Sequence, residues 1–210
     1  MSCMLTIAFA QSKPGTGKTT SAVWLCAALH ARGLEVVLVD ADPAASALQW
    51  SDLAGGFGWR VVGLPVRDLH RRVRDAAHGA DVVVADVPQI EDHAGIARSA
   101  MRWAREVVVP VAPAGVELDR MAPIRKELDA LDAVRREDAR WCVLLNRTVS
   151  QAASVRDARD TLRGLGDDVL SVHVPRLERY ATSFGLTPDP RGTAYDELAT
   201  VLLARDGGAA

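Results

Sequence analysis

The chain has 210 residues, of which 49% are hydrophobic, so it can bury one substantial core. Its formal net charge of -2 excludes a large, uniformly basic face, so any contact with nucleic acid is expected to use a local patch. No apolar run approaches the roughly 18 residues that a membrane span needs, and the N-terminus lacks the pattern of a signal peptide.

Short apolar runs alternate with longer segments of helical periodicity, which is typical of βαβ units and a parallel sheet. Continuous apolar runs at residues 36–39 and 82–84 predict central strands that are buried on both faces. The predicted strands are residues 5–10, 35–40, 60–62, 81–86, 106–111, 140–145 and 169–172.

The predicted helices lie between these strands, and residues 175–190 are expected to hold a short helix before a proline-rich turn. We therefore expect one α/β domain over residues 1–205, a mostly parallel twisted sheet with helices on both faces, and a disordered tail over residues 206–210. The predicted helices are residues 17–32, 66–77, 95–104, 118–135, 152–165 and 193–204.

A glycine-rich loop joins the first predicted strand to the first predicted helix. Gly15 and Gly17 let the backbone pass closely around phosphate oxygens, and the start of the helix adds partial positive charge. Lys18 is expected to reach the β- and γ-phosphates of a nucleotide, and the Thr19 hydroxyl to bind Mg²⁺. The alternative is an ordinary glycine turn, but the strand before it, the helix after it and the Gly-Lys-Thr-Thr ending together favour a phosphate loop. The nucleotide-binding residues predicted here are Lys13, Pro14, Gly15, Thr16, Gly17, Lys18, Thr19 and Thr20.

Lysine is rare in this sequence. The chain has 25 lysines and arginines together, but only Lys13, Lys18 and Lys126 are lysines. Two of the three lie in the glycine-rich loop, which indicates that these two positions require a compact ammonium group rather than a guanidinium.

Acidic residues end two of the predicted strands. Asp40 and Asp42 stand in the sequence Asp-Ala-Asp-Pro, and Asp86 ends an apolar run. Ligands of open α/β sheets bind at the carboxyl ends of strands, where Mg²⁺ is commonly held by one or two carboxylates, water and phosphates. A turn without chemistry and an ordinary strand end are the alternatives, but beside a phosphate loop these residues predict a P-loop NTPase that uses ATP and Mg²⁺.

The loop resembles the deviant Walker A motif of the ParA/MinD family, K-G-G-x-G-K-[ST], over residues 13–19. Ser12 stands where the common P-loop pattern has its first glycine, and Pro14 replaces a glycine of the family motif. Because proline fixes φ and lacks an N–H group, this departure leaves the loop geometry open. The resemblance implies that Lys13 reaches across a dimer to the partner's nucleotide. Within this family, the position of Trp50 and the short length of the chain resemble those of the small plasmid-partition ParA proteins.

The resemblance also implies roles for the acidic residues. Asp42 is expected to orient the attacking water, and Asp40 and Asp86 to support Mg²⁺ together with Thr19. The catalytic residues would then be Lys13, Lys18 and Asp42.

Further family motifs place the base of the nucleotide. Asn146 and Arg147 match the strand end whose asparagine reads adenine, with a plain turn as the alternative. Pro175 and Arg176 match the loop that closes over the base. The resemblance covers roughly residues 4–200.

A DNA-binding face is expected on the helix over residues 152–165. Arg156, Arg159 and Arg163 recur at i, i+3 and i+7, which places them on one side of that helix. The open alternative is a solvated face paired with acidic residues. The basic face could be extended by Arg147, Arg176 and Arg179. In the alternative, the arginines of the helix pair with Asp157, Asp160 and Asp167. A second group, Arg67, Arg71, Arg72 and Arg74, favours a surface or partner contact.

By resemblance, the protein is expected to be an ATPase that forms an ATP-dependent homodimer, binds DNA non-specifically and drives partition or positioning of a plasmid, chromosome or other cargo. A ParB-like centromere-binding or adaptor protein would stimulate hydrolysis. The three cysteines, Cys3, Cys26 and Cys142, form no Cys-x-x-Cys pair and favour buried thiols in a reducing cytosol. We expect a cytoplasmic protein that associates with the nucleoid when it binds ATP.

Two other functions remain open. A MinD-like membrane-associated positioning ATPase would need a basic amphipathic C-terminal helix, but residues 196–206 hold one cation, so a membrane partner is not expected. A metabolic P-loop ligase of the dethiobiotin or cobyrinate type shares the fold, but no substrate motif supports it.

Overall fold

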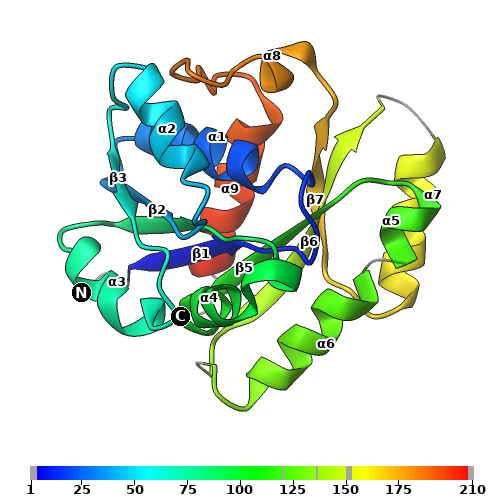
Figure 1. The fold of residues 1–210 in the computed structure, drawn as a ribbon. Coiled ribbons are helices and arrows are strands. Elements are labelled where there is room, and N and C mark those ends of the chain that lie inside the picture. The colour runs from blue at the N-terminus through cyan, green and yellow to red at the C-terminus, as the bar shows by residue number, and fades with distance from the viewer. Residues whose placement is uncertain (1–3, 120, 136, 150–152, 208–210) are drawn as a thin grey trace.

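Seven parallel strands form a single sheet at the centre of the molecule (Figure 1). The computed structural model describes residues 4–119, 121–135, 137–149 and 153–207. Within the sheet the strands lie in the order β3-β2-β4-β1-β5-β6-β7. The strands are β1 (Leu5–Phe9), β2 (Val36–Asp40), β3 (Arg60–Gly63), β4 (Val82–Asp86), β5 (Glu106–Val111), β6 (Arg140–Thr148) and β7 (Val169–Pro175).

Alternate side chains of each strand enter two hydrophobic cores, one on each face of the sheet. In β2, Val37 and Val39 belong to one core, whereas Val36 and Leu38 belong to the other. This burial on both faces explains why the central strands read as continuous apolar runs.

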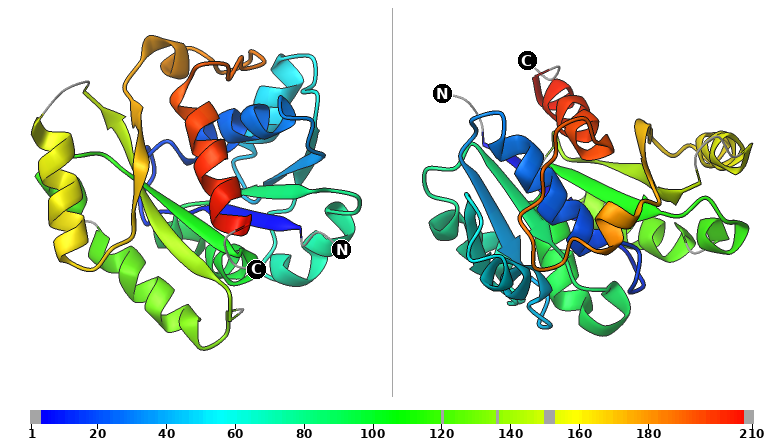
Figure 2. Two further views of the ribbon diagram at one scale, coloured as in Figure 1. Left: turned by 180° about the vertical axis from the view of Figure 1, so that it is seen from behind. Right: turned by 90° about the horizontal axis from the view of Figure 1, so that it is seen from above.

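Helices cover both faces, as the two views of Figure 2 show. One core contains side chains of α1 (Lys18–His30), α2 (Ser46–Leu53), α8 (Glu178–Ala181) and α9 (Ala194–Gly207). The other contains side chains of α3 (Leu69–Ala76), α4 (Ile90–Trp103), α6 (Met121–Asp132) and α7 (Ala153–Gly164), and α5 (Gly115–Asp119) packs beside α6 and α7. The expected single α/β domain with a parallel sheet is confirmed. No helix in the described ranges is long and apolar enough to pass through a membrane.

The register of three neighbouring strands brings the predicted site together. Asp86 of β4 lies opposite Asp40 of β2 and opposite Phe9, the last residue of β1. The glycine-rich loop follows β1 directly, at the point where the strand order reverses. The loop and two of the acidic residues therefore meet at the carboxyl edge of the sheet, where open α/β sheets bind their ligands.

Helix α2 was not predicted, because its cap is not local in sequence. Ala45, the residue before it, has a left-handed φ of 53° and makes no side-chain cap. Instead, the Asp40 carboxylate accepts hydrogen bonds from the backbone N–H groups of Ala47 and Leu48, at 2.9 and 3.0 Å. Asp40 lies seven positions before Ala47, the first residue of α2 whose N–H group it accepts. A cap this far from the helix leaves none of the usual sequence signals for a helix start.

Three other boundaries differ from the expectations. Helix α4 begins at Ile90 rather than residue 95 and is kinked at His93, where the backbone leaves helical geometry. The helix expected over residues 118–135 corresponds to α5 and α6, with residue 120 outside the described ranges. Helix α9 continues through Gly207, so the first two residues of the expected tail are helical, and residues 208–210 lie outside the described ranges.

Candidate functional site

The glycine-rich loop has the backbone shape that phosphate binding requires. Gly15 and Gly17 both take positive φ, 75° and 87°, which other residues rarely adopt. Gly17 precedes the first residue of α1 and makes no side-chain cap, so the first N–H groups of this helix are free of capping side chains. Pro14 lies exposed at the tip of the loop. The loop therefore presents the start of a helix to an anion.

Lys18 lies buried behind this loop. Its Nζ donates to the backbone oxygen of Lys13 at 3.3 Å. Burial lowers the pKa of Lys18, and the nearby carboxylates of Asp86 and Asp42 act in the opposite direction. The ammonium therefore lies between the loop and the acidic residues, as expected of a lysine that contacts phosphate.

Asp86 has an unusual environment. Its side chain is 1% exposed, and neither carboxylate oxygen has a hydrogen-bond partner in the part of the chain that the structure describes. Burial raises the pKa of Asp86 to about 7, while the neighbouring Thr19 hydroxyl and the Lys18 ammonium reduce the rise. A buried carboxylate whose oxygens lack hydrogen-bond partners fits a cation, because its neighbours compensate the desolvation penalty only in part.

The donor set fits Mg²⁺ bound with nucleotide rather than a protein metal cage. Among the described residues, no group of three or more His, Cys, Asp or Glu side chains could hold a metal ion. Mg²⁺ usually takes one or two carboxylates and completes its shell with water and phosphate oxygens. Asp86 and the Thr19 hydroxyl beside it would hold the ion here, directly or through water.

Asp40 is satisfied by backbone groups instead. Besides the two bonds to α2, its Oδ1 accepts the N–H of Asp42 at 3.1 Å. Burial raises the pKa of Asp40, and these three backbone N–H groups lower it. These hydrogen bonds hold Asp42 and the start of α2 in place, and the role of Asp40 in supporting Mg²⁺ stays a prediction. Asp42 itself is partly exposed, and its Oδ1 accepts the N–H of Ala44 at 2.9 Å, which leaves Oδ2 available at the edge of the site.

Lys13 lies at the surface beside the start of α4. Its Nζ is 3.9 Å from a Glu91 oxygen, and both side chains are about half exposed. The backbone N–H groups of Ile90 and Glu91 donate to the oxygens of Gln11 and Ser12, at 3.3 Å each, which ties this end of α4 to the loop. Among the described residues, Lys13 is therefore held only by a weak, solvent-screened ion pair at the protein surface.

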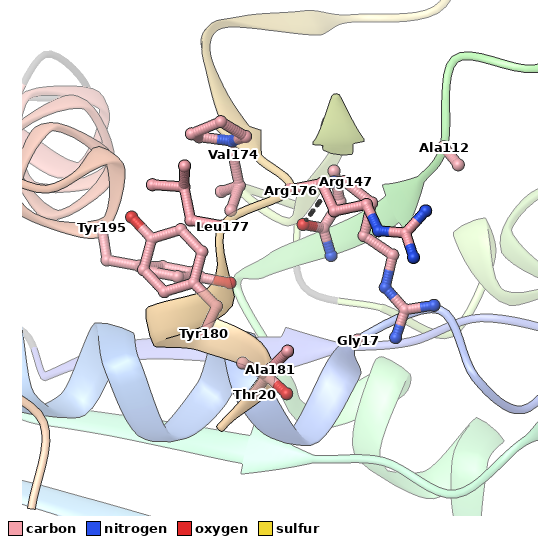
Figure 3. A pocket seen from close by; sticks show the side chains of 12 residues that line it. Gly17, Thr20, Ala112, Arg147, Val174, Arg176, Leu177, Tyr180, Ala181 and Tyr195 are labelled. Carbon is pink, nitrogen blue, oxygen red and sulfur yellow. Dashed lines mark hydrogen bonds between the residues drawn. The ribbon is translucent and has the colours of Figure 1, made fainter. Parts of the chain in front are cut away.

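A cavity of about 580 Å³ adjoins the loop. It brings together residues that sequence motifs assigned to the base: Asn146, Arg147, Pro175 and Arg176 line it beside Gly17 and Thr20. Figure 3 shows Arg147 and Arg176 on one side of the cavity and two tyrosines on the other. The volume is within the range of small-molecule sites.

The two tyrosines, Tyr180 of α8 and Tyr195 of α9, were missed by sequence reasoning. They are the only tyrosines in the chain. Both rings contact Trp24 of α1, with ring centroids 4.9 and 5.8 Å from it, and the Tyr195 hydroxyl is 3.1 Å from the Ser21 hydroxyl. The rarity of tyrosine was the one signal in the sequence that could have pointed to these two residues. Their contacts join α1 to segments that lie far apart from it in the chain.

Asn146 ties the cavity to the loop. Its Nδ2 donates to the Thr16 oxygen at 3.0 Å, and its Oδ1 accepts the Arg147 N–H at 2.8 Å. Arg147 has a left-handed φ of 55°, a strained conformation for a residue with a side chain. Such strain is typical of backbone held in place by a functional site.

The arginines expected to bind DNA are divided between two faces of the sheet. Arg156 and Arg163 of α7 are exposed, while Arg159 is half-buried and donates to the Ser171 oxygen at 2.9 Å. Arg179 is exposed but belongs to α8, which packs on the opposite core from α7. No single helix surface therefore carries the whole set.

Two further expectations concern acidic residues and cysteines. Asp167, expected beside the α7 arginines, is buried and forms an ion pair with Arg125 instead. Cys26 and Cys142 are buried free thiols whose pKa values are raised by burial, and Cys3 lies outside the described residues.

The sequence matches a known family over most of its length. The family is CbiA, described as the CobQ/CobB/MinD/ParA nucleotide binding domain, and the match covers residues 7–186. This range includes the loop, the acidic residues and most of the residues that line the cavity beside the loop.

Two relatives have similar sequences. The chromosome-partitioning ATPase Soj of Thermus thermophilus is 28% identical over an alignment of 242 residues, which covers 95% of each chain. The maintenance of carboxysome distribution protein A of Gloeobacter kilaueensis is 36% identical over 113 residues, 53% of this chain and 51% of that protein. The second match thus spans about half the length of that relative.

Solved structures share the fold. Cobyrinic acid a,c-diamide synthase from Mycobacterium smegmatis, with bound ADP and magnesium, has a TM-score of 0.77 and 20% identity, covering 99% of this chain and 97% of that one. An ATP complex of McdA from Cyanothece, in which one residue is substituted, has a TM-score of 0.73 and 15% identity, covering 100% and 97%. The cell division ATPase MinD of Pyrococcus furiosus has a TM-score of 0.69 and 19% identity, covering 99% and 100%.

Identities this low show the fold alone, but the synthase and McdA structures hold nucleotide, and Soj and MinD are both called ATPases. The family match spans residues 7–186, most of this chain. The protein belongs to the CobQ/CobB/MinD/ParA nucleotide-binding family, whose ParA and MinD members are ATPases.

Proposed function

We propose that this protein is a ParA-type ATPase that dimerises on ATP, binds DNA non-specifically, and drives the partition or positioning of a plasmid, chromosome or other cargo. The observation that carries the proposal is the placement of Lys13. This lysine lies in the phosphate loop, yet its side chain is about half exposed and its ammonium lies 3.9 Å from Glu91, whereas Lys18 is the lysine buried behind the loop. The likeness to Soj along 95% of both chains supports the same function.

The residues of one protomer would bind and position the nucleotide. The loop N–H groups and Lys18 would hold the phosphates, and Thr19 and Asp86 would hold Mg²⁺, which neutralises charge on the phosphates. Asp42, with an available oxygen at the edge of the site, would orient water for attack on the γ-phosphate. Asn146 and the neighbouring cavity would take the base.

Dimerisation would complete the site. In one protomer the Lys13 ammonium is exposed and only weakly paired, so it is available to reach the phosphates of a partner's nucleotide. A site completed by a second copy makes dimerisation depend on ATP, because the lysine gains its phosphate contact only in the dimer.

DNA contact would follow from the dimer. Each protomer exposes Arg156, Arg163 and Arg179, with Arg159 partly covered. A net charge of -2 makes one copy a weak binder, whereas two linked copies gain avidity without new contacts. Contacts to phosphates rather than base edges predict little sequence preference. A ParB-like centromere-binding or adaptor protein would stimulate hydrolysis and release the DNA, and the ATP-bound protein would reside on the nucleoid.

The two other functions receive less support. Helix α9, which a MinD-like membrane contact would require, buries Tyr195, Leu198 and Leu202 in the core, so these apolar side chains are not free for lipid. The likeness to a cobyrinic acid a,c-diamide synthase, at 20% identity, concerns the fold.

Sedimentation and DNA binding with ATP and with ADP test the proposal. We expect a dimer with ATP only, and ATP-dependent DNA binding that weakens with salt, with a shallower salt slope in the Arg156→Ala/Arg159→Ala/Arg163→Ala chain. The Asp42→Ala chain should dimerise on ATP but hydrolyse it at least about a hundredfold more slowly. If the wild-type chain binds no DNA with either ATP or ADP, the DNA-based function is contradicted. If the Asp42→Ala chain hydrolyses ATP at the wild-type rate, the role assigned to Asp42 is contradicted.

A further inference from the structure

A second cavity lies at the opposite end of the sheet from the nucleotide site, where the strands begin. Its volume is about 480 Å³, again within the range of small-molecule sites. The start of β1, helix α3, the last turn of α4 and the segment after α6 form its walls. Figure 1 shows α3 and α4 lying next to each other at this end of the molecule.

The cavity contains a buried arginine with unused donors. Arg135 is 9% exposed, and its Nη2 donates to the backbone oxygens of Ala104 and Arg140, at 3.3 and 2.9 Å. Its Nε and Nη1 have no hydrogen-bond partner within the described ranges. Burial lowers the pKa of Arg135, while the charges of Asp132 and Glu106 act against this. Arg135 therefore places a positive charge in the wall of the cavity, and the two nitrogens without partners are buried within that wall.

Two further arginines stand at the cavity wall. Arg74 of α3 and Arg102 of α4 are exposed, and the structure gives neither an ion pair nor a hydrogen bond within the described residues. Other arginines of the same helices are paired, Arg72 with Asp68 and Arg98 with Glu127. The cavity wall therefore includes one arginine of α3 and one of α4, neither of which forms an ion pair with a described carboxylate.

A histidine also lines the cavity. The Ser99 hydroxyl oxygen accepts the His70 backbone N–H at 3.0 Å and lies 2.8 Å from Nδ1 of the same residue, so these contacts fix the position of the ring. Burial, followed by the charges of Arg102 and Arg71, lowers the pKa of His70.

The lining of the cavity also includes apolar side chains. Trp103, which is partly exposed, and the buried Val73 line it. A flat ring can pack against tryptophan while charged donors hold its anionic group. The combination of three arginines, a histidine and an aromatic wall matches an organic anion rather than a bare ion.

We propose that this cavity binds a small phosphate monoester that carries an aromatic ring, at a site separate from the nucleotide site. Its phosphate would contact Arg74, Arg102 and Arg135, and its ring would pack on Trp103. A hollow of this size suits a small molecule better than a DNA duplex, whose phosphates lie on a convex surface.

Calorimetric titration of the full chain with phenyl phosphate tests the proposal. We expect one site, weakened at least about tenfold in Arg74→Ala/Arg102→Ala, because charge-assisted hydrogen bonds are lost. Arg135 is left unchanged in this variant, since it also holds backbone oxygens. Trp103→Leu should weaken phenyl phosphate but not orthophosphate.

Matched controls separate this site from other causes. Arg71→Ala removes the same charge from α3 outside the cavity wall and should change affinity less than about threefold. Lys18→Ala removes the P-loop contact and should retain the wild-type affinity for phenyl phosphate. No binding by the wild type, equal losses in Arg71→Ala and Arg74→Ala/Arg102→Ala, loss in Lys18→Ala, or displacement of the probe by duplex DNA would each overturn the proposal.

Discussion

Two carboxylates that face each other across neighbouring strands are surrounded differently. Asp40 accepts three backbone N–H groups, whereas Asp86 accepts no hydrogen bond from the described residues. Without a cation, the ionised side chain of Asp86 is therefore a buried charge that destabilises the fold, whereas backbone N–H groups stabilise the carboxylate of Asp40. A cation would therefore relieve a larger penalty at Asp86 than at Asp40.

Replacing Asp86 by asparagine should stabilise the nucleotide-free protein while removing its response to Mg²⁺. The change removes a desolvated charge, and we expect the free energy of unfolding at pH 8 to rise by about 1–3 kcal/mol. Urea denaturation with and without Mg²⁺ and nucleotide measures both effects. The control is Asp42→Asn, whose carboxylate is partly exposed and should change stability little. A less stable Asp86→Asn chain would contradict this account.

Replacing Lys13 by alanine should leave ATP binding nearly intact but abolish ATP-dependent dimerisation and turnover. Its ammonium contacts only Glu91 among the described residues, so its own nucleotide loses little. Sedimentation and a fluorescent ATP analogue measure the two properties. Lys126→Ala is the matched control, because Lys126 is the third lysine of the chain and lies on α6, away from the loop. If the Lys13→Ala chain dimerises normally, Lys13 has no role in the dimer and is only a residue of the loop.

Among the elements, the phosphate loop and the base cavity are joined by one contact. A Cβ atom on Gly17 would lie 2.6 Å from Nδ2 of Asn146. Because Asn146 is held by its hydrogen bonds to Thr16 and Arg147, it cannot yield without losing them. The end of β6 thus restricts the loop residue that precedes α1.

Alanine at Gly15 and at Gly17 should therefore destabilise the nucleotide-free chain by different amounts. Both positions have positive φ, but a Cβ at Gly15 meets nothing within 4 Å. We expect Gly15→Ala to cost about 1–2 kcal/mol from backbone strain and Gly17→Ala about 2–4 kcal/mol, because hydrogen bonds are lost as well. Adding Asn146→Ala to each variant completes a double-mutant cycle, with coupling expected only for Gly17. Equal costs for both glycines would contradict the contact.

Across the whole molecule, one buried carboxylate fastens the last helix to the sheet. Glu106 of β5 accepts from Nε of Arg140 at 2.6 Å and from two nitrogens of Arg205 at 3.0 Å. Arg205 lies near the end of α9 and also pairs with Asp168. Because α9 supplies Tyr195 to the base cavity, this network supports the site from the far end of the helix.

Glu106→Gln should lower the free energy of unfolding by about 2–4 kcal/mol, because it leaves two arginines without their shared buried partner. Thermal denaturation at low and high salt measures the loss, which should depend little on salt since the Glu106 side chain is only 2% exposed. Asp189→Asn, which breaks the exposed pair with Arg191, should leave the melting temperature unchanged. A small, salt-dependent loss in Glu106→Gln would show that the network is solvent-screened.

Local patterns in the sequence were enough to predict the parallel sheet, most of its helices and the chemistry of the loop. Apolar runs identify strands buried on both faces, and Gly15, Gly17 and Lys18 define a phosphate loop within a few residues. The resemblance to the ParA/MinD family, rather than a local pattern, singled out Asn146 and Arg176, which line the cavity beside the loop.

Contacts between distant segments could be known only from the folded chain. The cap of α2 comes from Asp40, the base cavity gains Tyr195 from α9, and the α7 and α8 arginines lie on opposite faces of the sheet. The arginine-lined second cavity likewise needs β1, α3, α4 and the segment after α6 at once. Each depends on packing between residues far apart in the chain, and such packing leaves no periodic or spacing signal in the sequence.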